Sequence, residues 1–261
     1  SLEALYAKAK SLEEQGLTAY IYTGSYSAPP VTLTGGIVRD LELIDKVIGV
    51  GELALSDHRS SHPDARTLLK IASDAHLGGL LGKKAGVLHI HFGDGKKGLA
   101  PLAALMAESD LPSGMFVPTH LNRSMKLFGQ AVSHCAAGGR IDLTAGEAEG
   151  LPVPDAVQML AQSGADLSLV TVSSDAGGSG PGGTGRVRPL FDDIVSIIKD
   201  KSLPPETAFS LATQNPATVL GLYPGKGTLR AGGDADILIT DKGYQIRAVY
   251  CAGKPLYQNS R

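Results

Sequence analysis

The fold is decided by the stretch Val47-Ile48-Gly49-Val50-Gly51-Glu52-Leu53-Ala54-Leu55, which runs directly into Ser56-Asp57-His58-Arg59. A nearly continuous apolar run of this length is typical of a buried β-strand. Residues 63–77 follow with apolar positions at helical spacing, and residues 86–92 form another apolar run. A strand, a crossover helix and a second strand predict a parallel pair.

The same alternation continues on both sides of this unit. Further strands are predicted at residues 18–23, 115–120, 140–144 and 167–173. Helices are predicted at residues 2–16, 40–46, 99–108, 125–137, 154–163, 189–201 and 204–220, with a glycine-rich loop at 176–185. Six such strands predict an α/β fold with a parallel sheet, two strands short of a closed (β/α)8 TIM-like barrel. Either the sheet is open, or the chain begins after the first two units.

The pattern changes near residue 222. Short alternating runs at residues 236–240, 246–250 and 254–257 are separated by glycines, and no helical spacing lies between them. We therefore predict two parts: a barrel over residues 1–222 and the strands of a small β-sandwich over residues 223–261.

Composition excludes several classes of protein. The 261 residues carry a formal net charge of −2, which provides no basic surface for nucleic acid. No apolar run reaches the roughly 18 residues that a membrane span needs. The two cysteines, Cys135 and Cys251, give no disulfide framework, so we expect a reducing, cytoplasmic location.

Four of the predicted strands end in side chains that suit a divalent metal. These ends are Glu52 with Asp57-His58-Arg59, His89-Ile90-His91, Pro118-Thr119-His120, and Ser173-Ser174-Asp175. In a barrel all strand C-termini open on one face, so these residues converge. Imidazole and carboxylate groups are ligands that zinc accepts. The sequence therefore predicts a metal hydrolase.

Two sets of motifs resemble a known family. The segments Thr213-Gln214-Asn215-Pro216-Ala217 and Gly232-Gly233-Asp234-Ala235-Asp236 resemble the closing signature of the amidohydrolase superfamily, in which the last barrel helix leads into a small β-sandwich. Residues 22–26, 56–60, 118–123 and 170–175 look like those of isoaspartyl (β-aspartyl) dipeptidases. The resemblance extends over essentially the whole chain.

The resemblance implies a zinc-dependent metallopeptidase that cleaves the isopeptide bond of β-aspartyl dipeptides with a hydroxide held between two zinc ions. It implies metal ligation by Glu52, His91, His120 and Asp175. Many members have a carboxylated lysine where this chain has Glu52, which also offers an anionic fork for two cations. His89 shares the side of the strand with His91, but only His91 reaches the rim.

The resemblance also implies roles in catalysis and substrate binding. Asp175 would move the proton from water to the leaving amine, although a turn or cap role is the alternative. Tyr26 would donate to the oxyanion and contact substrate. Arg59 and Arg123 would bind the substrate carboxylates bidentately, with Ser179 adding a hydroxyl contact.

The family's first His-x-His pair has no counterpart in this chain. We therefore expect the chain to be a C-terminal portion that needs an N-terminal segment of the same protein as a partner, and we expect a homo-oligomer. Two alternatives remain open. One is another amidohydrolase, such as a cyclic amidase or a deacetylase, and the other is a non-catalytic fragment that covers its open sheet edge with a partner segment.

Overall fold

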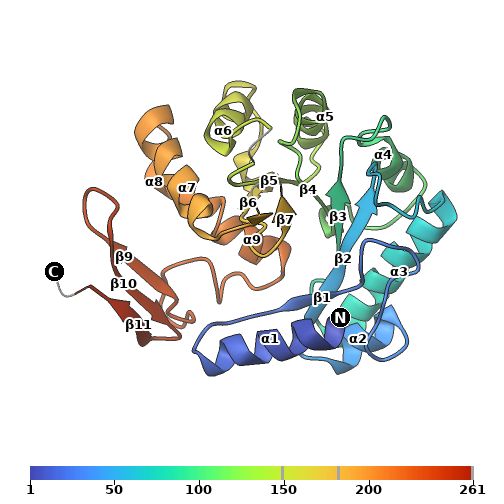
Figure 1. Ribbon diagram of the computed structural model, residues 1–261, viewed down its shortest axis with the longest axis horizontal. Coiled ribbons are helices and arrows are strands. Elements are labelled where there is room, and N and C mark those ends of the chain that lie inside the picture. The colour runs from blue at the N-terminus through green and yellow to red at the C-terminus, as the bar shows by residue number, and fades with distance from the viewer. Residues whose placement is uncertain (148–149, 181–182, 260–261) are drawn as a thin grey trace.

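The computed structural model describes residues 1–147, 150–180 and 183–259. Within them, parallel strands alternate with helices, and Figure 1 shows the helices forming an arc around the strands. The parallel strands are β1 (Ile21–Thr23), β2 (Val47–Leu55), β3 (Val87–Phe92), β4 (Phe116–Thr119), β5 (Ile141–Thr144) and β6 (Val170–Ser173). The predicted parallel α/β arrangement is confirmed.

The strands are joined in sequence order. One sheet has the order β1-β2-β3-β4, and β5 pairs with β6 in a second sheet. The amide of Leu121, just past β4, donates to the carbonyl of Asp142 in β5 at 3.3 Å, so the two sheets are neighbours. All of these pairings are parallel. The C-terminal ends of the strands therefore share one face.

Helices connect and cover the strands. They are α1 (Leu2–Glu14), α2 (Ile37–Leu43), α3 (Ala65–Gly82), α4 (Ala100–Ala107), α5 (Met125–Ala136), α6 (Val153–Gln162), α7 (Arg188–Lys201), α8 (Pro205–Ser210) and α9 (Gln214–Val219). The single helix predicted at residues 204–220 was wrong, because the chain breaks between α8 and α9. Pro216 explains the break, since proline is tolerated in the first turn of a helix but not in its interior. None of the helices in the described ranges has the length and apolar character needed to cross a bilayer.

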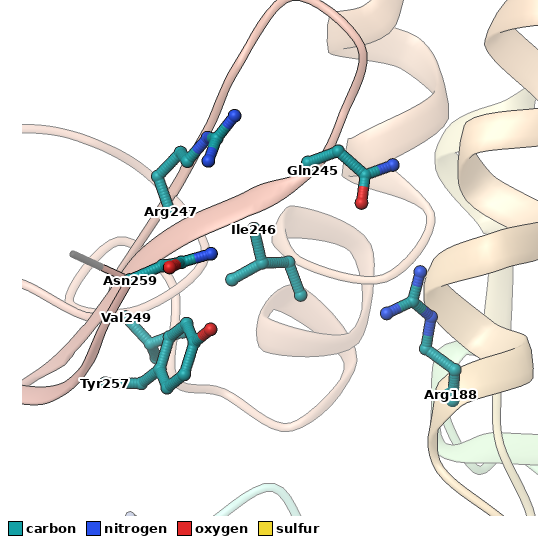
Figure 2. A pocket seen from close by; sticks show the side chains of 7 residues that line it. All are labelled: Arg188, Gln245, Ile246, Arg247, Val249, Tyr257 and Asn259. Carbon is teal, nitrogen blue, oxygen red and sulfur yellow. The ribbon is translucent and has the colours of Figure 1, made fainter. Parts of the chain in front are cut away.

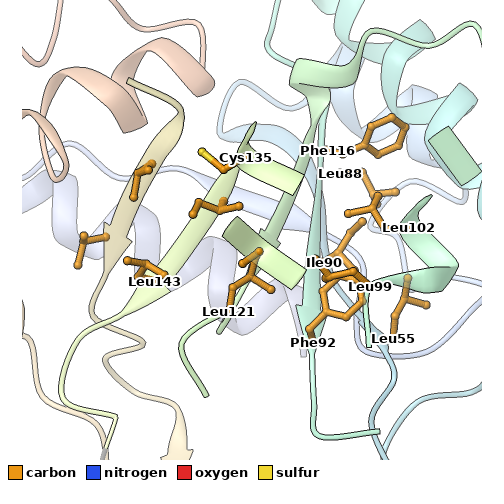
Figure 3. Packing of buried hydrophobic residues seen from close by; sticks show 14 of the residues in the cluster. Leu55, Leu88, Ile90, Phe92, Leu99, Leu102, Phe116, Leu121, Cys135 and Leu143 are labelled. Atoms are coloured by element: carbon orange, nitrogen blue, oxygen red, sulfur yellow. The ribbon is translucent and has the colours of Figure 1, made fainter. Parts of the chain in front are cut away.

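The core lies between the strands and the helices. Leu55, Ile90 and Phe92 point from β2 and β3 toward Leu102 on α4, and all are buried (Figure 3). Full burial of a side chain of this size stabilises the fold by about 1.5–3 kcal/mol. The opposite faces of the strands carry the polar residues, which is why the site forms there.

The C-terminal residues form a separate antiparallel sheet. Its order is β11 (Lys254–Gln258), β10 (Ile246–Cys251), β9 (Ile237–Thr240). Lys226 anchors the entry to this sheet by contacting Asp234 at 2.9 Å and Asp236 at 2.6 Å. The glycine-rich loop predicted at residues 176–185 differs from the structure in one respect, because β7 (Ser179–Gly180) and β8 (Gly183–Thr184) pair as a short antiparallel ribbon.

Candidate metal centre

A bulge in β2 places a carboxylate on the inner face of the strands. Val50 pairs with Leu88 and Leu53 pairs with Ile90, so β2 has one residue more than β3 between these two points. Strict alternation would turn Glu52 to the helix-covered face, with Val50. The extra residue lets Glu52 face inward while Leu53 still enters the core.

Glu52 meets three imidazoles. Its Oε1 lies 3.5 Å from His120 Nε2 and 3.6 Å from His89 Nε2, and its Oε2 lies 3.6 Å from His91 Nδ1. Burial acts to raise the pKa of Glu52, but the neighbouring imidazoles of His120, His89 and His91 outweigh burial and hold its pKa well below the usual range. Glu52 is therefore an anion surrounded by potential metal ligands.

The donor set fits a divalent cation. In the described residues, one group of potential ligand atoms lies within 4.8 Å of one another, and it comprises Glu52, His91 and His120. Ligands at the usual zinc distances stand about 3.4 Å apart around a tetrahedral ion. His120 Nε2 lies 3.5 Å from Oε1 of Glu52 and His91 Nδ1 lies 3.6 Å from Oε2, so each imidazole stands close to this spacing from one of the two carboxylate oxygens. A carboxylate with two neutral imidazoles is a ligand set that suits zinc.

His120 is held by the strand that follows it. It adopts a left-handed backbone conformation at the end of β4, with φ of 63°. Its Nδ1 lies 2.7 Å from the hydroxyl of Thr144, at the end of β5. Because Nδ1 is occupied in this way, Nε2 is left to face Glu52. Holding the second ring nitrogen is the usual way to orient a metal-binding histidine.

His91 is buried and has partners at both ring nitrogens. The hydroxyl of Tyr26 lies 3.0 Å from Nδ1, on the side of Glu52. Burial first, and then the charge of Glu52, raise the pKa of Tyr26 to about 12. Tyr26 therefore stays protonated at neutral pH and can donate a hydrogen bond.

Charged groups gather at the other ring nitrogen of His91. Its Nε2 lies 2.9 Å from Asp57 Oδ2, 3.0 Å from Arg59 Nη2 and 3.3 Å from Arg123 Nη1. Arg59 also donates to both carboxylate oxygens of Asp57 at 2.9 Å. This pairing is the main cause that holds the pKa of Asp57 well below its usual range. The two predicted arginines therefore lie side by side at one edge of the site.

The two remaining predicted site residues stand apart from the three-residue group. Asp175 follows β6 with φ of 45°, and its exposed carboxylate lies against the backbone of Gly178. Its charge raises the pKa of Tyr26 less than burial and Glu52 do. Its metal-ligand role stays a prediction. The backbone of Ser179 lies in β7, but its side chain is outside what the structure describes.

Sequence reasoning missed two contacts. His89 was expected to stay below the rim, yet its Nε2 lies 3.6 Å from Glu52 Oε1 and its ring stacks on Tyr22 at 5.2 Å. Asp57 was named only as part of the Asp57-His58-Arg59 motif, without a predicted contact to His91. The pairing of Asp57 with Arg59, two residues later, was the available signal, because a short acidic residue so close can hold a guanidinium.

A separate cleft lies elsewhere and does not include the site. It has a volume of about 500 Å³ and lies between α7 and the C-terminal sheet (Figure 2). Its lining residues are Arg188, Gln245, Ile246, Arg247, Val249, Tyr257 and Asn259. None of these is a histidine or a carboxylate, so the cleft lacks the chemistry of the metal centre.

Comparisons with known proteins agree with this geometry. The model of the amidohydrolase family matches residues 132–256. The β-aspartyl dipeptidase of Fervidobacterium islandicum AW-1, solved in complex with a β-Asp-Leu dipeptide, superposes with a TM-score of 0.93 and 43% identity over 99% of this chain and 70% of that chain. An N-acetylglucosamine-6-phosphate deacetylase from Pasteurella multocida shares the fold alone, with a TM-score of 0.58 and 10% identity over 95% of this chain and 65% of that chain.

A local sequence match adds a second relative. The N-acetylglucosamine-6-phosphate deacetylase of Caenorhabditis elegans is 39% identical over 64 residues, which are 24% of this chain and 15% of that protein. Parallel strands that carry a carboxylate and two histidines at one inner face, together with these matches, define the class as the amidohydrolase superfamily. Because it covers 70% of the Fervidobacterium protein at 43% identity, the chain belongs to the β-aspartyl dipeptidase family within that class.

Proposed function

We propose that this chain carries the main part of the active site of a zinc-dependent isoaspartyl dipeptidase. The observation that carries the proposal is the arginine pair. Arg59 and Arg123 both reach the edge of His91, within 3.0 and 3.3 Å of its Nε2. A likeness to a dipeptidase solved with β-Asp-Leu supports the same substrate class.

The substrate chemistry fits two guanidinium groups. A β-aspartyl dipeptide has two free carboxylates, one on the isoaspartyl residue and one on the leaving residue. A guanidinium fork binds a carboxylate through two parallel hydrogen bonds. We assign Arg59 and Arg123 to these two carboxylates and Ser179 to an additional contact.

The metal would be held by Glu52, His91 and His120, with Asp175 as a further ligand. When bound, a zinc ion polarises the carbonyl and lowers the pKa of a water molecule toward neutrality. Asp175 takes a proton from the attacking water and delivers it to the leaving nitrogen. Tyr26 donates its phenol proton in a hydrogen bond to the oxygen on which charge develops.

A second ion needs further ligands. We propose that an N-terminal segment of the same protein would supply them from a His-x-His pair, and that Glu52 would help to hold both ions. In the same assembly, β1–β6 would be part of a (β/α)8 barrel and β9–β11 part of a small β-sandwich. We also propose that the protein forms a homo-oligomer and is located in the cytoplasm.

A deacetylase is the second candidate. The 39% identity to the deacetylase of Caenorhabditis elegans favours it, although that match covers only 24% of this chain. An N-acetyl sugar phosphate needs cationic groups as well, so the arginines alone do not decide. The dipeptidase is preferred because its likeness extends over 99% of the chain at 43% identity.

The test compares substrates on one preparation. Zinc content and hydrolysis of β-Asp-Leu, N-acetylglucosamine-6-phosphate and dihydroorotate are measured for the 261-residue chain alone and for the protein with its N-terminal segment. We expect β-Asp-Leu hydrolysis, and only with the segment present. Turnover of one of the other substrates instead would reject the dipeptidase, and zinc-free protein with no turnover would identify a non-catalytic chain.

Arginine variants test the substrate assignment. Arg59→Met and Arg123→Met each remove a charged hydrogen-bonding group, so we expect kcat/KM to fall about 10- to 100-fold. Arg66→Met, on the exposed surface of α3, is the matched control and should leave kcat/KM unchanged. If all three variants have the same kcat/KM, Arg59 and Arg123 do not bind the substrate.

A further inference from the structure

Three groups compete for one nitrogen atom. Asp57 Oδ2, Arg59 Nη2 and Arg123 Nη1 all lie within 2.9 to 3.3 Å of His91 Nε2. A neutral imidazole nitrogen carries either a proton or a lone pair. It can therefore donate to the carboxylate or accept from a guanidinium, but it cannot do both. His91 has two mutually exclusive hydrogen-bonding arrangements.

Only one of these arrangements can bind a metal. If Nε2 accepts from an arginine, the proton of the neutral ring is on Nδ1, which faces Glu52 Oε2 at 3.6 Å and Tyr26 at 3.0 Å. Nδ1 then has no free lone pair. If Nε2 donates to Asp57, the lone pair of Nδ1 points toward Glu52. A metal ligand must offer this lone pair.

We propose that Asp57 is a positioning residue that selects the metal-binding tautomer of His91. This inference rests on the proposed function, because it assigns the partner of a proposed zinc ligand. Asp57 is 5% exposed and is fixed by the backbone amide of Arg59 at 2.7 Å. Gly93 packs against it so closely that an added Cβ would lie 2.7 Å from Asp57 Cβ and 2.8 Å from Cγ. The carboxylate therefore has little freedom to leave His91.

The same carboxylate links the metal ligand to the substrate-binding arginine. Asp57 Oδ2 accepts from Arg59 Nη2 at 2.9 Å as well as lying 2.9 Å from His91 Nε2. Once Nε2 carries the proton, neither Arg59 nor Arg123 can donate to His91. Arg59 keeps its hydrogen bonds to Asp57, and Arg123 Nη1 keeps its hydrogen bond to the carbonyl of Phe92 at 3.2 Å. The tautomer that suits a metal is thus also the one in which His91 does not compete for the N–H groups of the two arginines.

The first variant is Asp57→Asn. The carboxylate accepts from Arg59 through both oxygens and also faces His91, whereas an amide has one oxygen and one NH2 group. Its oxygen should stay at the Oδ1 position, where the backbone amide and Nε of Arg59 donate, so its NH2 group turns toward His91 Nε2 and favours the tautomer protonated at Nδ1. We expect the dissociation constant for zinc, measured by competition with a chelating dye and without substrate, to rise about 10- to 100-fold. Asp64→Asn removes an equal charge from the exposed cap of α3 and should leave zinc affinity unchanged.

The second variant changes no polar group. In Gly93→Ala the new methyl group must push the Asp57 carboxylate aside, so zinc affinity should fall in the same direction. A third measurement needs no variant: nitrogen-15 NMR of the protein prepared without metal should show His91 protonated at Nε2, because zinc bound at Nδ1 would impose that tautomer by itself. A merely structural role of Asp57 would leave this tautomer unchanged in Asp57→Asn.

The outcomes separate this inference from the proposed function. Wild-type protein that binds no zinc overturns both. Wild-type protein that binds zinc while Asp57→Asn and Gly93→Ala bind it equally well overturns only the role of Asp57, as does a His91 ring protonated at Nδ1 in the protein prepared without metal. Weaker zinc binding by both variants, with Asp64→Asn unchanged, supports it.

Discussion

The hydroxyl of Tyr26 offers a sharp test of the site, because it lies next to the proposed zinc ligand and is proposed to act in catalysis. The substitution Tyr26→Phe removes only this hydroxyl. The ring contacts remain, since the ring lies 4.6 Å from that of His91 and 5.1 Å from the Arg59 guanidinium. Any change can therefore be attributed to the lost hydrogen bonds.

Two effects of opposite sign are expected. Loss of one oxyanion donor lowers kcat by about 10²- to 10³-fold. In the metal-free protein, however, the hydroxyl occupies His91 Nδ1 at 3.0 Å, and zinc must displace it. Removing a neutral hydrogen bond worth about 0.5–1.5 kcal/mol should tighten zinc binding by roughly 2- to 10-fold.

The pH dependence follows from the state of the phenol. The pKa of Tyr26 is raised to about 12, so the hydroxyl keeps its proton through the neutral range. The ratio of wild-type to Tyr26→Phe activity should therefore stay constant from about pH 6 to pH 9. Its decline begins only as the pH rises toward that raised pKa.

The assay measures zinc affinity and steady-state hydrolysis of β-Asp-Leu on the same preparations of wild-type and variant protein. Tyr6→Phe, on α1, is the matched control and should change neither quantity. A tenfold loss of zinc affinity with a proportional loss of activity would refute the reasoning. Tyr26 would then be a support for His91 and not an oxyanion donor.

Three further predictions concern the framework. Asp142→Asn should lower the free energy of unfolding in urea by about 1–3 kcal/mol, because the buried carboxylate accepts hydroxyl hydrogen bonds at 2.6, 2.6 and 2.7 Å; an unchanged midpoint would contradict this. Gly51→Ala should cost about 1–3 kcal/mol and weaken zinc binding, because its Cβ would lie 2.7 Å from His89 Cβ; wild-type zinc affinity would show that β2 adapts without moving Glu52. Lys226→Met should speed hydrogen exchange in β9–β11 while β2 and β3 keep their protection, and equal rates would exclude Lys226 as an anchor.

The parallel part of the fold was predictable because each strand is an apolar run bounded by turn residues. The predicted and observed strands differ by at most three residues at their ends, with β2 predicted at its observed bounds and β1 predicted from residue 18 but observed from Ile21. The break between α8 and α9 was missed because helical spacing continues across it. The position of Pro216, in the first turn of α9, shows that the proline signal outweighs spacing there.

The site was less accessible to reasoning from residue spacing. His91 and His120 lie at or just past strand ends, where the alternation rule places them correctly. For Glu52 the same rule gives the wrong face, and the family resemblance supplied what spacing could not. The Asp57 contact with His91 depends on how the loop after β2 folds back, with Ser60 donating to the carbonyl of Ala54 at 2.5 Å. The spacing of apolar residues does not predict that this loop folds back toward β2.

The added residue in β2 has a consequence for how such a centre could arise or be redesigned. In β2 the side chains that face the helices are already part of the hydrophobic core. Few positions are therefore left at which an acidic residue could be introduced. Lengthening the strand by one residue turns a side chain to the opposite surface without altering the residues that follow, since Leu53 and Leu55 keep their partners Ile90 and Phe92. Shortening β2 by one residue at this point should then abolish the acidic ligand while the neighbouring packing survives. At this point of β2 the acidic ligand can be gained or lost while the packing of the core stays the same.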